Sequence, residues 1–448
     1  MTSVRKIRYM TAISDDAPPA KTSPAANVSR SRTVISPAAR LAAVFWVTGQ
    51  VWQTPATAWG GPRQRDSVAQ GGWRTGGVPF LWLGTPMTDK LLGRARLVAQ
   101  GLLTRPHADP LAVVTAQGAM QGQDLPGVIA STALRTPSNS VSAVTDAMDA
   151  GLVVRGYPMR GTLLLLPAAD ASWMGQLCAA PALRAARSRQ HQLGLDDARM
   201  ARAREVAFEA LSRSPQGLSR ADLFALWEAD GQPTKGGPGY HLLARMISET
   251  FLFFGPWNGQ DQNVVLAEGW VPVGSGLEGR FNGDRIAAAA ELLRRYLCSH
   301  GPATIRDFGW WTKLTLREAR AALDLVADEF EEGNEADPTY WRPGLRDEVA
   351  ALGDAVANPL LLPGFDEFIL GYQDRLFAMS AEEHQRLVPG NNGVFGRSLV
   401  VDGVVLGVWK RGGRPSNRQL ELTEFSPVPD DLRPQLARLF DAFPFVSD

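Results

Sequence analysis

Two glutamines separated by a single glycine, Gln121 and Gln123, are the residues whose type and spacing best suit a chemical role. Glycines accompany them within residues 117–126, at a break between two helical patterns. An amide has no useful pKa, so it cannot serve as a general acid or base, but it can hold a water, a sugar or a base edge because it both donates and accepts hydrogen bonds. The pair therefore suits a reaction whose leaving group is already activated. Judged on residue types alone, an ordinary surface role is the stronger alternative.

The elements around the glutamines predict how they are positioned. Residues 128–134 are apolar at helical spacing, residues 138–140 can cap a helix, and residues 141–150 form another short helical pattern. Residues 152–155 and 160–166 predict two strands, joined through a turn at the Gly-Tyr-Pro of residues 156–158. Helices followed by a hairpin are the order of a winged helix.

The same order of elements recurs further along the chain. The second set has predicted helices at 200–212 and 238–250, a helix that begins at 218–223, and strands at 251–255 and 263–266. The third set has predicted helices at 284–300 and 315–326 and a helix that begins at 303–308. The end of the chain differs, because Asp402-Gly403 lies between apolar runs and predicts a hairpin. A strand at 419–425 and a helix at 431–440 complete a small antiparallel barrel or sheet.

The predicted fold class is α+β, with three tandem winged-helix units followed by a small antiparallel β-barrel-like domain. A length of 448 residues fits several domains. The predicted boundaries are a disordered N-terminal extension at 1–86, a first winged helix at 87–180, a second at 181–275, a third at 276–350 and the β-barrel-like domain at 351–448. Met87 is an alternative start of translation, in which case the extension is an over-long gene prediction.

Composition argues against several classes of protein and site. The sequence has no phosphate-binding loop, no dinucleotide fingerprint and no His-Glu-x-x-His motif, so neither a metal nor a cofactor is expected. Its two cysteines, Cys178 and Cys298, indicate no disulfide framework, and no apolar run is long enough for a membrane span. A reducing, cytoplasmic location is the expectation. The adjacent carboxylates Asp366 and Glu367 are a poor acid and base pair, since sequence neighbours usually point apart, and they are expected at a helix start or a barrel junction.

Charge is the main argument against nucleic-acid binding. Residues 1–86 hold ten Lys/Arg and three Asp/Glu, which leaves 36 basic and 43 acidic residues from Met87 onward. Any DNA contact must therefore come from local basic patches. The best candidate is a basic run with Arg184, Arg187, Arg189, His191, Arg199, Arg202 and Arg204. A solvated helical face, with nearby acidic residues as ion-pair partners, is an equally good interpretation.

The chain resembles the winged-helix DNA glycosylases of the AlkZ type. The resemblance rests on the motifs at residues 118–124, 151–155, 159–163, 301–312, 361–367 and 402–409, with Arg135, and covers 87–446. It implies a monofunctional glycosylase without metal that removes N7-alkylated guanine, or unhooks interstrand crosslinks, from double-stranded DNA. A monomer is the expected state. The family's catalytic Gln-x-Gln corresponds to Gln121 and Gln123.

Further residues within the similar region are expected to contact DNA. They are Arg135, Arg160, Thr162, Arg184, Arg187 and Arg189. One position departs from the pattern, because Leu164 stands where the family often has a histidine after the Arg-Gly-Thr-Leu of the wing. Two alternatives remain: a non-catalytic winged-helix DNA-binding protein or regulator, and a scaffold whose winged helices bind protein.

Overall fold

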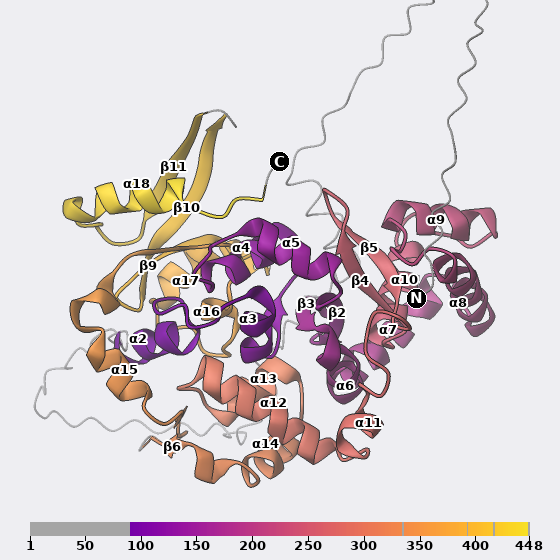
Figure 1. Ribbon diagram of the computed structural model, residues 1–448, viewed down its shortest axis with the longest axis horizontal. Coiled ribbons are helices and arrows are strands. Elements are labelled where there is room, and N and C mark those ends of the chain that lie inside the picture. Colours follow the sequence, from indigo (N-terminus) through magenta and orange to yellow (C-terminus); the bar gives the residue numbers. More distant parts are fainter. Residues whose placement is uncertain (1–89, 334–335, 392, 415–416, 447–448) are drawn as a thin grey trace, which may run out of the picture. The chain divides into compact units, whose positions relative to one another are not determined.

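The computed structural model describes residues 90–333, 336–391, 393–414 and 417–446 (Figure 1). The predicted disorder of residues 1–86 and the alternative start at Met87 lie outside these residues. Within them, no helix is both long enough and apolar enough to cross a membrane.

The segment around the glutamines has the helices that the sequence predicts. Its elements are α2 (Lys90–Ala99), α3 (Pro110–Gln117), β1 (Met120–Gln121), α4 (Leu125–Leu134), α5 (Val141–Asp149), β2 (Val153–Met159) and β3 (Thr162–Pro167). Asp109 caps α3 by accepting a hydrogen bond from the Ala112 amide at 2.8 Å, and Ser140 caps α5. Gly118 ends α3 with a φ of 74°, a left-handed conformation that glycine adopts easily and that turns the chain into β1.

The predicted turn at Gly-Tyr-Pro is wrong. Strand β2 continues through these residues to Met159, and the hairpin turns at Arg160 and Gly161, whose φ angles of 59° and 67° are both positive. Consecutive positive φ angles match the twist of paired strands in a two-residue turn. The register of β2 and β3 shifts between Gly156 and Met159, so Pro158 lies at an irregularity of the ladder, where a missing N–H is tolerated.

The next two segments also follow the predicted order of helices. The second comprises α6 (Ala168–Cys178), α7 (Ala180–Gln192), α8 (Asp197–Ser212), α9 (Arg220–Ala229), α10 (Pro238–Ser248), β4 (Leu252–Trp257) and β5 (Gln262–Leu266). The third comprises α11 (Leu277–Phe281), α12 (Arg285–His300), α13 (Ile305–Thr312), α14 (Leu316–Leu323), β6 (Glu331–Glu332) and β7 (Tyr340–Trp341). Thr304 and Thr315 form capping boxes at the starts of α13 and α14.

A five-stranded sheet joins the first two hairpins in the order β1-β3-β2-β4-β5. Strands β2 and β4 meet where Arg155 pairs with Phe254. In β1 and β3, Met120 pairs with Leu165 and Gln121 with Leu164. Because side chains alternate across a strand, Gln121 and Leu164 point to the face opposite that of Met120 and Leu165.

The C-terminal part contains a second sheet in the linear order β11-β10-β9-β8. Its elements are α15 (Leu345–Ala351), β8 (Leu360–Leu362), α16 (Glu367–Leu370), α17 (Ala381–Leu387), β9 (Arg397–Val401), β10 (Val404–Arg414), β11 (Asn417–Glu424) and α18 (Arg433–Asp441) (Figure 1). The predicted Asp402-Gly403 turn is confirmed, with φ angles of 56° and 77°. Closure of this sheet into a barrel stays a prediction.

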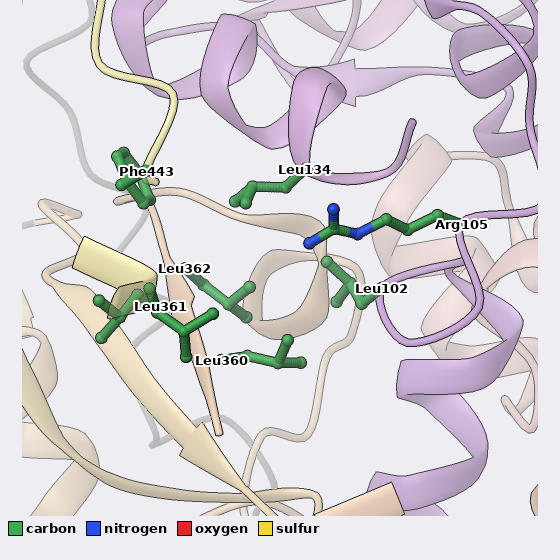
Figure 2. Close-up of a pocket in the computed structure, with 8 residues that line it drawn as sticks. Leu102, Arg105, Leu134, Leu360, Leu361, Leu362 and Phe443 are labelled. Carbon is green, nitrogen blue, oxygen red and sulfur yellow. The ribbon is translucent and has the colours of Figure 1, made fainter. Parts of the chain in front are cut away.

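A small apolar pocket lies between this sheet and the first segment (Figure 2). Leucines and Phe443 line it, with Arg105 as its charged residue, and its volume of ≈ 20 Å³ is close to that of one water. The pocket therefore reflects packing between elements and offers no chemistry.

Candidate functional site

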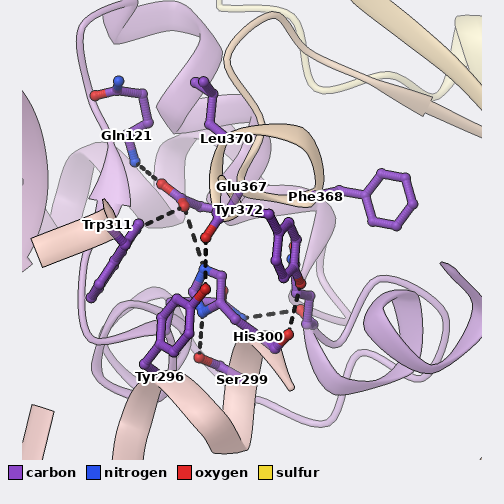
Figure 3. Close-up of polar contacts among 12 residues, drawn as sticks. Gln121, Tyr296, Ser299, His300, Trp311, Glu367, Phe368, Leu370 and Tyr372 are labelled. Carbon is purple, nitrogen blue, oxygen red and sulfur yellow. Dashed lines mark hydrogen bonds and ion pairs between the residues drawn. The ribbon is translucent and has the colours of Figure 1, made fainter. Parts of the chain in front are cut away.

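Gln121 is held by its backbone, while its side chain keeps an unused hydrogen-bonding atom. The residue is 8% exposed, and its amide N–H donates to Oε1 of Glu367 at 2.6 Å. The side-chain amide points away from that carboxylate (Figure 3). Its Oε1 is buried without a hydrogen-bond partner. Buried polar atoms are normally paired, so an unpaired one next to a fixed backbone suggests a place for a ligand.

Strand β3 holds the rest of the motif. The Gly122 amide donates to the Leu163 carbonyl at 2.9 Å, and the half-buried Gln123 accepts from the Leu163 amide through Oε1 at 3.4 Å. A Cβ on Gly122 would lie 3.0 Å from Cδ of Arg155 and 3.2 Å from the Leu165 amide nitrogen. The close approach of the Arg155 side chain therefore favours glycine between the glutamines.

Arg155 supports this turn from the neighbouring strand. Its Nη1 donates to the Gly122 carbonyl at 3.0 Å, and its Nη2 forms an ion pair with Asp261 at 3.2 Å. Burial lowers the pKa of Arg155, and its Nε has no partner. The predicted motif thus depends on a residue of β2 and on a carboxylate from the loop before β5.

Glu367 connects Gln121 to a buried aromatic cluster (Figure 3). Its side chain is almost fully buried, and Oε2 lies 3.3 Å from both Nε2 of His300 and Nε1 of Trp311. Ser299 Oγ is 2.8 Å from Nδ1 of the same histidine. Burial lowers the pKa of His300, although the hydrogen bond to Glu367 opposes this effect. The sequence does not indicate this role, because 246 residues separate Glu367 from Gln121.

The neighbouring carboxylate, Asp366, confirms the predicted helix start. It caps α16 by accepting from the Phe368 amide at 2.9 Å, and it forms a two-bond ion pair with Arg135 at 2.8 and 2.9 Å. Burial alone would raise the pKa of Asp366, but the charge and hydrogen bonds of Arg135 outweigh burial and lower it.

The prediction that Arg135 contacts DNA is wrong. Its side chain is fully buried, and besides Asp366 its guanidinium donates to Gln100 and Ser131. All five N–H groups have acceptors, so none is left for a phosphate. Arg135 joins α4 to α16 and has a structural role.

Arg160 and Thr162 lie at the turn of the β2–β3 hairpin, and both carry unsatisfied polar atoms. Nε and Nη2 of Arg160 and Oγ1 of Thr162 are buried without partners, and burial lowers the pKa of Arg160. Leu164, two residues further along the strand, is fully buried opposite Gln121. The position of the family histidine is therefore a core position here, directly beside the first glutamine.

The three predicted arginines of α7 are exposed and, unlike two exposed arginines of α8, have no acidic partner among the described residues. Arg184, Arg187 and Arg189 form no ion pair among the described residues. Two arginines of the same basic run, Arg202 and Arg204, pair with acidic residues, as the solvated-face interpretation expects. Helix α7 approaches the hairpin turn, because a Cβ on Gly161 would lie 3.7 Å from Cβ of Ala182.

Asp124 is a further carboxylate at the motif. It directly follows Gln123 and precedes α4. Burial raises its pKa, although the charges of Arg397 and Arg155 oppose this effect. The sequence signal was its position within the 117–126 stretch, but the burial that raises its pKa is visible only in the fold.

The arrangement can orient a small polar molecule beside a fixed backbone. Unpartnered atoms of Gln121, Arg160 and Thr162 belong to strand β1 and to the β2–β3 hairpin that carries its partner strand. Within the described ranges, no group of three or more His, Cys, Asp or Glu residues is arranged to hold a metal ion. The amides can accept and donate hydrogen bonds, and hydrolysis of an already activated bond needs little more than that.

Comparisons with known proteins agree with the resemblance seen in the sequence. A curated relative, the interstrand DNA cross-link repair glycosylase of Streptomyces sahachiroi, is 30% identical over 127 residues, which are 28% of this chain and 34% of the relative. The match thus spans about a third of that relative's length. The solved structure of Streptomyces sahachiroi DNA glycosylase AlkZ has a TM-score of 0.64 at 20% identity, covers 80% of this chain and 98% of its own, and shows a shared α+β fold. The family model of AlkZ-like DNA glycosylases matches residues 114–443, well over half of the chain, so the chain belongs to the AlkZ-like DNA glycosylase family.

Proposed function

We propose that this protein is a monofunctional DNA glycosylase that hydrolyses the N-glycosidic bond of N7-alkylguanine and unhooks interstrand crosslinks made through that atom. The observation that carries the proposal is the paired amides of the Gln-x-Gln motif. Gln121 has a fixed backbone and a free side-chain oxygen, and β3 holds Gln123 beside it. Membership of the AlkZ-like family supports the same activity.

The chemistry suits side chains that cannot transfer protons. Alkylation at N7 gives the purine a positive charge, so it leaves with the electrons of the glycosidic bond as a neutral base. Water attacks C1′ of the oxocarbenium-like sugar, and its proton passes to solvent. The Oε1 of Gln121 would accept a hydrogen bond from this water, and Gln123 would orient the sugar. Asp124 and Glu367 flank the motif and are not required as proton donors.

The substrate in this proposal is double-stranded DNA bound by one chain acting as a monomer. We interpret the three helix-and-hairpin segments as winged helices and the C-terminal sheet as part of a barrel-like domain. The exposed face of α7, with Arg184, Arg187 and Arg189, would contact phosphates. The hairpin turn with Arg160 and Thr162 would approach the lesion strand. These local patches offset the acidic balance of the rest of the chain.

The proposal is tested with duplex DNA that contains N7-methylguanine and with a duplex crosslinked by a nitrogen mustard. Purified protein should release the free base, leave an abasic site and unhook the crosslink. A protein with both Gln121→Ala and Gln123→Ala should bind the same duplex and release nothing above the spontaneous rate.

A second candidate function is DNA binding without catalysis, as in a regulator. The residue at position 164 favours this second function. Leu164 is buried beside Gln121, at the position where the family often has a histidine. Tight duplex binding with no base release by the wild-type protein would support this function and contradict the glycosylase.

A further inference from the structure

Three cationic side chains lie over the ring of one half-buried tryptophan, Trp310. The guanidinium carbons of Arg160 and Arg375 lie 4.9 and 5.0 Å from the ring centroid, and Nζ of Lys313 lies 5.6 Å from it. They come from the β2–β3 turn, from the chain after α16, and from the C-terminal end of α13. We call these four residues the Trp310 cluster.

Carboxylates lie near these charges without forming an ion pair with them. Glu367 opposes the burial that lowers the pKa of Arg160, and Asp307 and Asp374 oppose the burial that lowers the pKa of Arg375. Among the described residues, no ion pair includes any of the three cations. Asp307, the acidic residue on the same helix as Trp310, is occupied because it accepts from Thr304 and from the Gln373 amide. Two buried nitrogens of Arg160 have no acceptor at all. Like charges brought together without an ion-pair partner are unfavourable, so this geometry favours the binding of an anion.

The shifts in the pKa values of Lys313 and Arg375 agree with this geometry. Partial desolvation and then the charge of Arg160 lower the pKa of Lys313, although its side chain reaches solvent. Burial and the same charge lower the pKa of Arg375 to about 10, although Asp307 and Asp374 oppose this shift. Trp310 also lines an open hollow of ≈ 270 Å³, together with Arg306, Leu316 and other residues, none of which is one of the three cations. The hollow leaves the tryptophan open to a ligand from solvent.

Helix α16 links the cluster to the glutamine motif. Its first residue, Glu367, accepts from the Gln121 amide, whereas its last residue, Leu370, accepts from Nη1 of Arg160 at 3.4 Å. Ile369, between them, accepts from Nε of Arg375 at 3.0 Å. One short helix therefore fixes the first glutamine and two of the three cations, so the anion lies near the reacting sugar.

We propose that the Trp310 cluster binds a backbone phosphate of the DNA strand that carries the lesion, next to the nucleotide at the glutamines. This inference rests on the glycosylase function proposed above. A phosphate fits better than the damaged base, because an N7-alkylated purine is itself cationic and the cluster would repel it. The cluster would position the sugar by holding its phosphate, and it would donate no proton.

The test pairs Lys313→Gln with single neutral methylphosphonate linkages placed around the lesion. Lys313 is exposed, so its replacement should leave the fold intact, and Lys235→Gln, which removes an exposed lysine in the loop between α9 and α10, is the matched control. The duplex carries a 2′-fluoro N7-methylguanosine, whose fluorine disfavours the oxocarbenium-like state and prevents cleavage during titration. Dissociation constants are measured over a range of salt concentrations.

We expect one linkage at which the neutral group weakens wild-type binding about tenfold and weakens Lys313→Gln binding clearly less, because Arg160 and Arg375 still contact the phosphate. The slope of log affinity against log salt should fall by about 0.9 in Lys313→Gln, as for one lost phosphate contact. Lys235→Gln should keep the wild-type response at that linkage. Equal losses for wild type and Lys313→Gln at every linkage would overturn the inference.

Two further outcomes separate the possible sources of the anion and the two proposals. If inorganic phosphate at constant ionic strength inhibits the wild type but not Lys313→Gln, and no linkage is special, the cluster binds free phosphate and the DNA contact is overturned. Absence of base release from unfluorinated DNA, with the special linkage retained, would contradict the glycosylase but support the cluster. Base release together with equal losses of affinity at every linkage would support the glycosylase and contradict the phosphate contact at the cluster.

Discussion

Glu367 should control the reaction without touching the substrate, because it fixes the backbone of Gln121. Its carboxylate accepts from the Gln121 amide at 2.6 Å and from Trp311 Nε1 at 3.3 Å, and it lies 3.3 Å from His300 Nε2. Replacement by glutamine keeps an oxygen for the Gln121 amide and removes the charge. Replacement by leucine leaves that amide buried without an acceptor.

The expected magnitudes follow from these contacts. A hydrogen bond to a charged group contributes about 1 kcal/mol more than one between neutral groups, so Glu367→Gln should slow base release about fivefold. An unsatisfied buried donor costs about 1–3 kcal/mol, so Glu367→Leu should slow it by about 5- to 150-fold. Glu367→Gln also places an NH2 group opposite the Trp311 N–H, which should lower the free energy of unfolding by about 1–3 kcal/mol.

The assay is single-turnover release of N7-methylguanine at saturating protein, with the dissociation constant measured separately. The rate should fall while DNA affinity stays within about twofold, since Glu367 is buried and cannot reach DNA. In a Gln121→Ala background, Glu367→Gln should slow release far less than it does in the wild type. Equal effects of Glu367→Gln in both backgrounds would refute the reasoning, because Glu367 would then act independently of Gln121.

Three further predictions test the surroundings of the site. Arg135→Met should lower the free energy of unfolding by about 3–5 kcal/mol in chemical denaturation, because it leaves Asp366 buried without its ion-pair partner, while DNA affinity of the folded protein stays unchanged. Gly122→Ala should destabilise by about 1–3 kcal/mol and slow base release, since its Cβ would lie 3.0 Å from Arg155; unchanged kinetics would contradict the close packing. Burial and nearby arginines lower the pKa of His241 to about 4. The unfolded chain therefore binds this proton more readily than the folded one, so stability should fall as the pH drops from about 6.5 to 4, by at most about 3 kcal/mol, and His241→Gln should flatten that fall.

Local sequence patterns were sufficient to predict most of the helices and the hairpins. Apolar periodicity and caps such as Ser140 and Thr304 act within a few residues, so they can be read directly from the sequence. The Asp402-Gly403 turn was predicted for the same reason. The Gly-Tyr-Pro turn was wrongly predicted because a shift in strand register accommodates the proline, and register depends on the partner strand.

The candidate site could be predicted only in part, since its supports are distant in sequence. Gln121 and Gln123 were identified from their spacing and from the family resemblance, and their catalytic role stays a proposal. Glu367 could not be connected to Gln121, because only the packing of α16 against β1 brings them together. Arg135 was wrongly predicted to contact DNA for the same reason, because its burial depends on an ion pair with Asp366, which is 231 residues away in the sequence.

The central claim is that the two glutamines carry out the chemistry and contribute little to binding. The most direct test is single-turnover release of N7-methylguanine by Gln121→Ala and by Gln123→Ala, beside the dissociation constant of each protein for the uncleavable duplex. We expect a loss of at least about 100-fold in rate for one or both variants, with affinity within about threefold of the wild type. Wild-type rates in both variants would contradict the account, whatever the affinity.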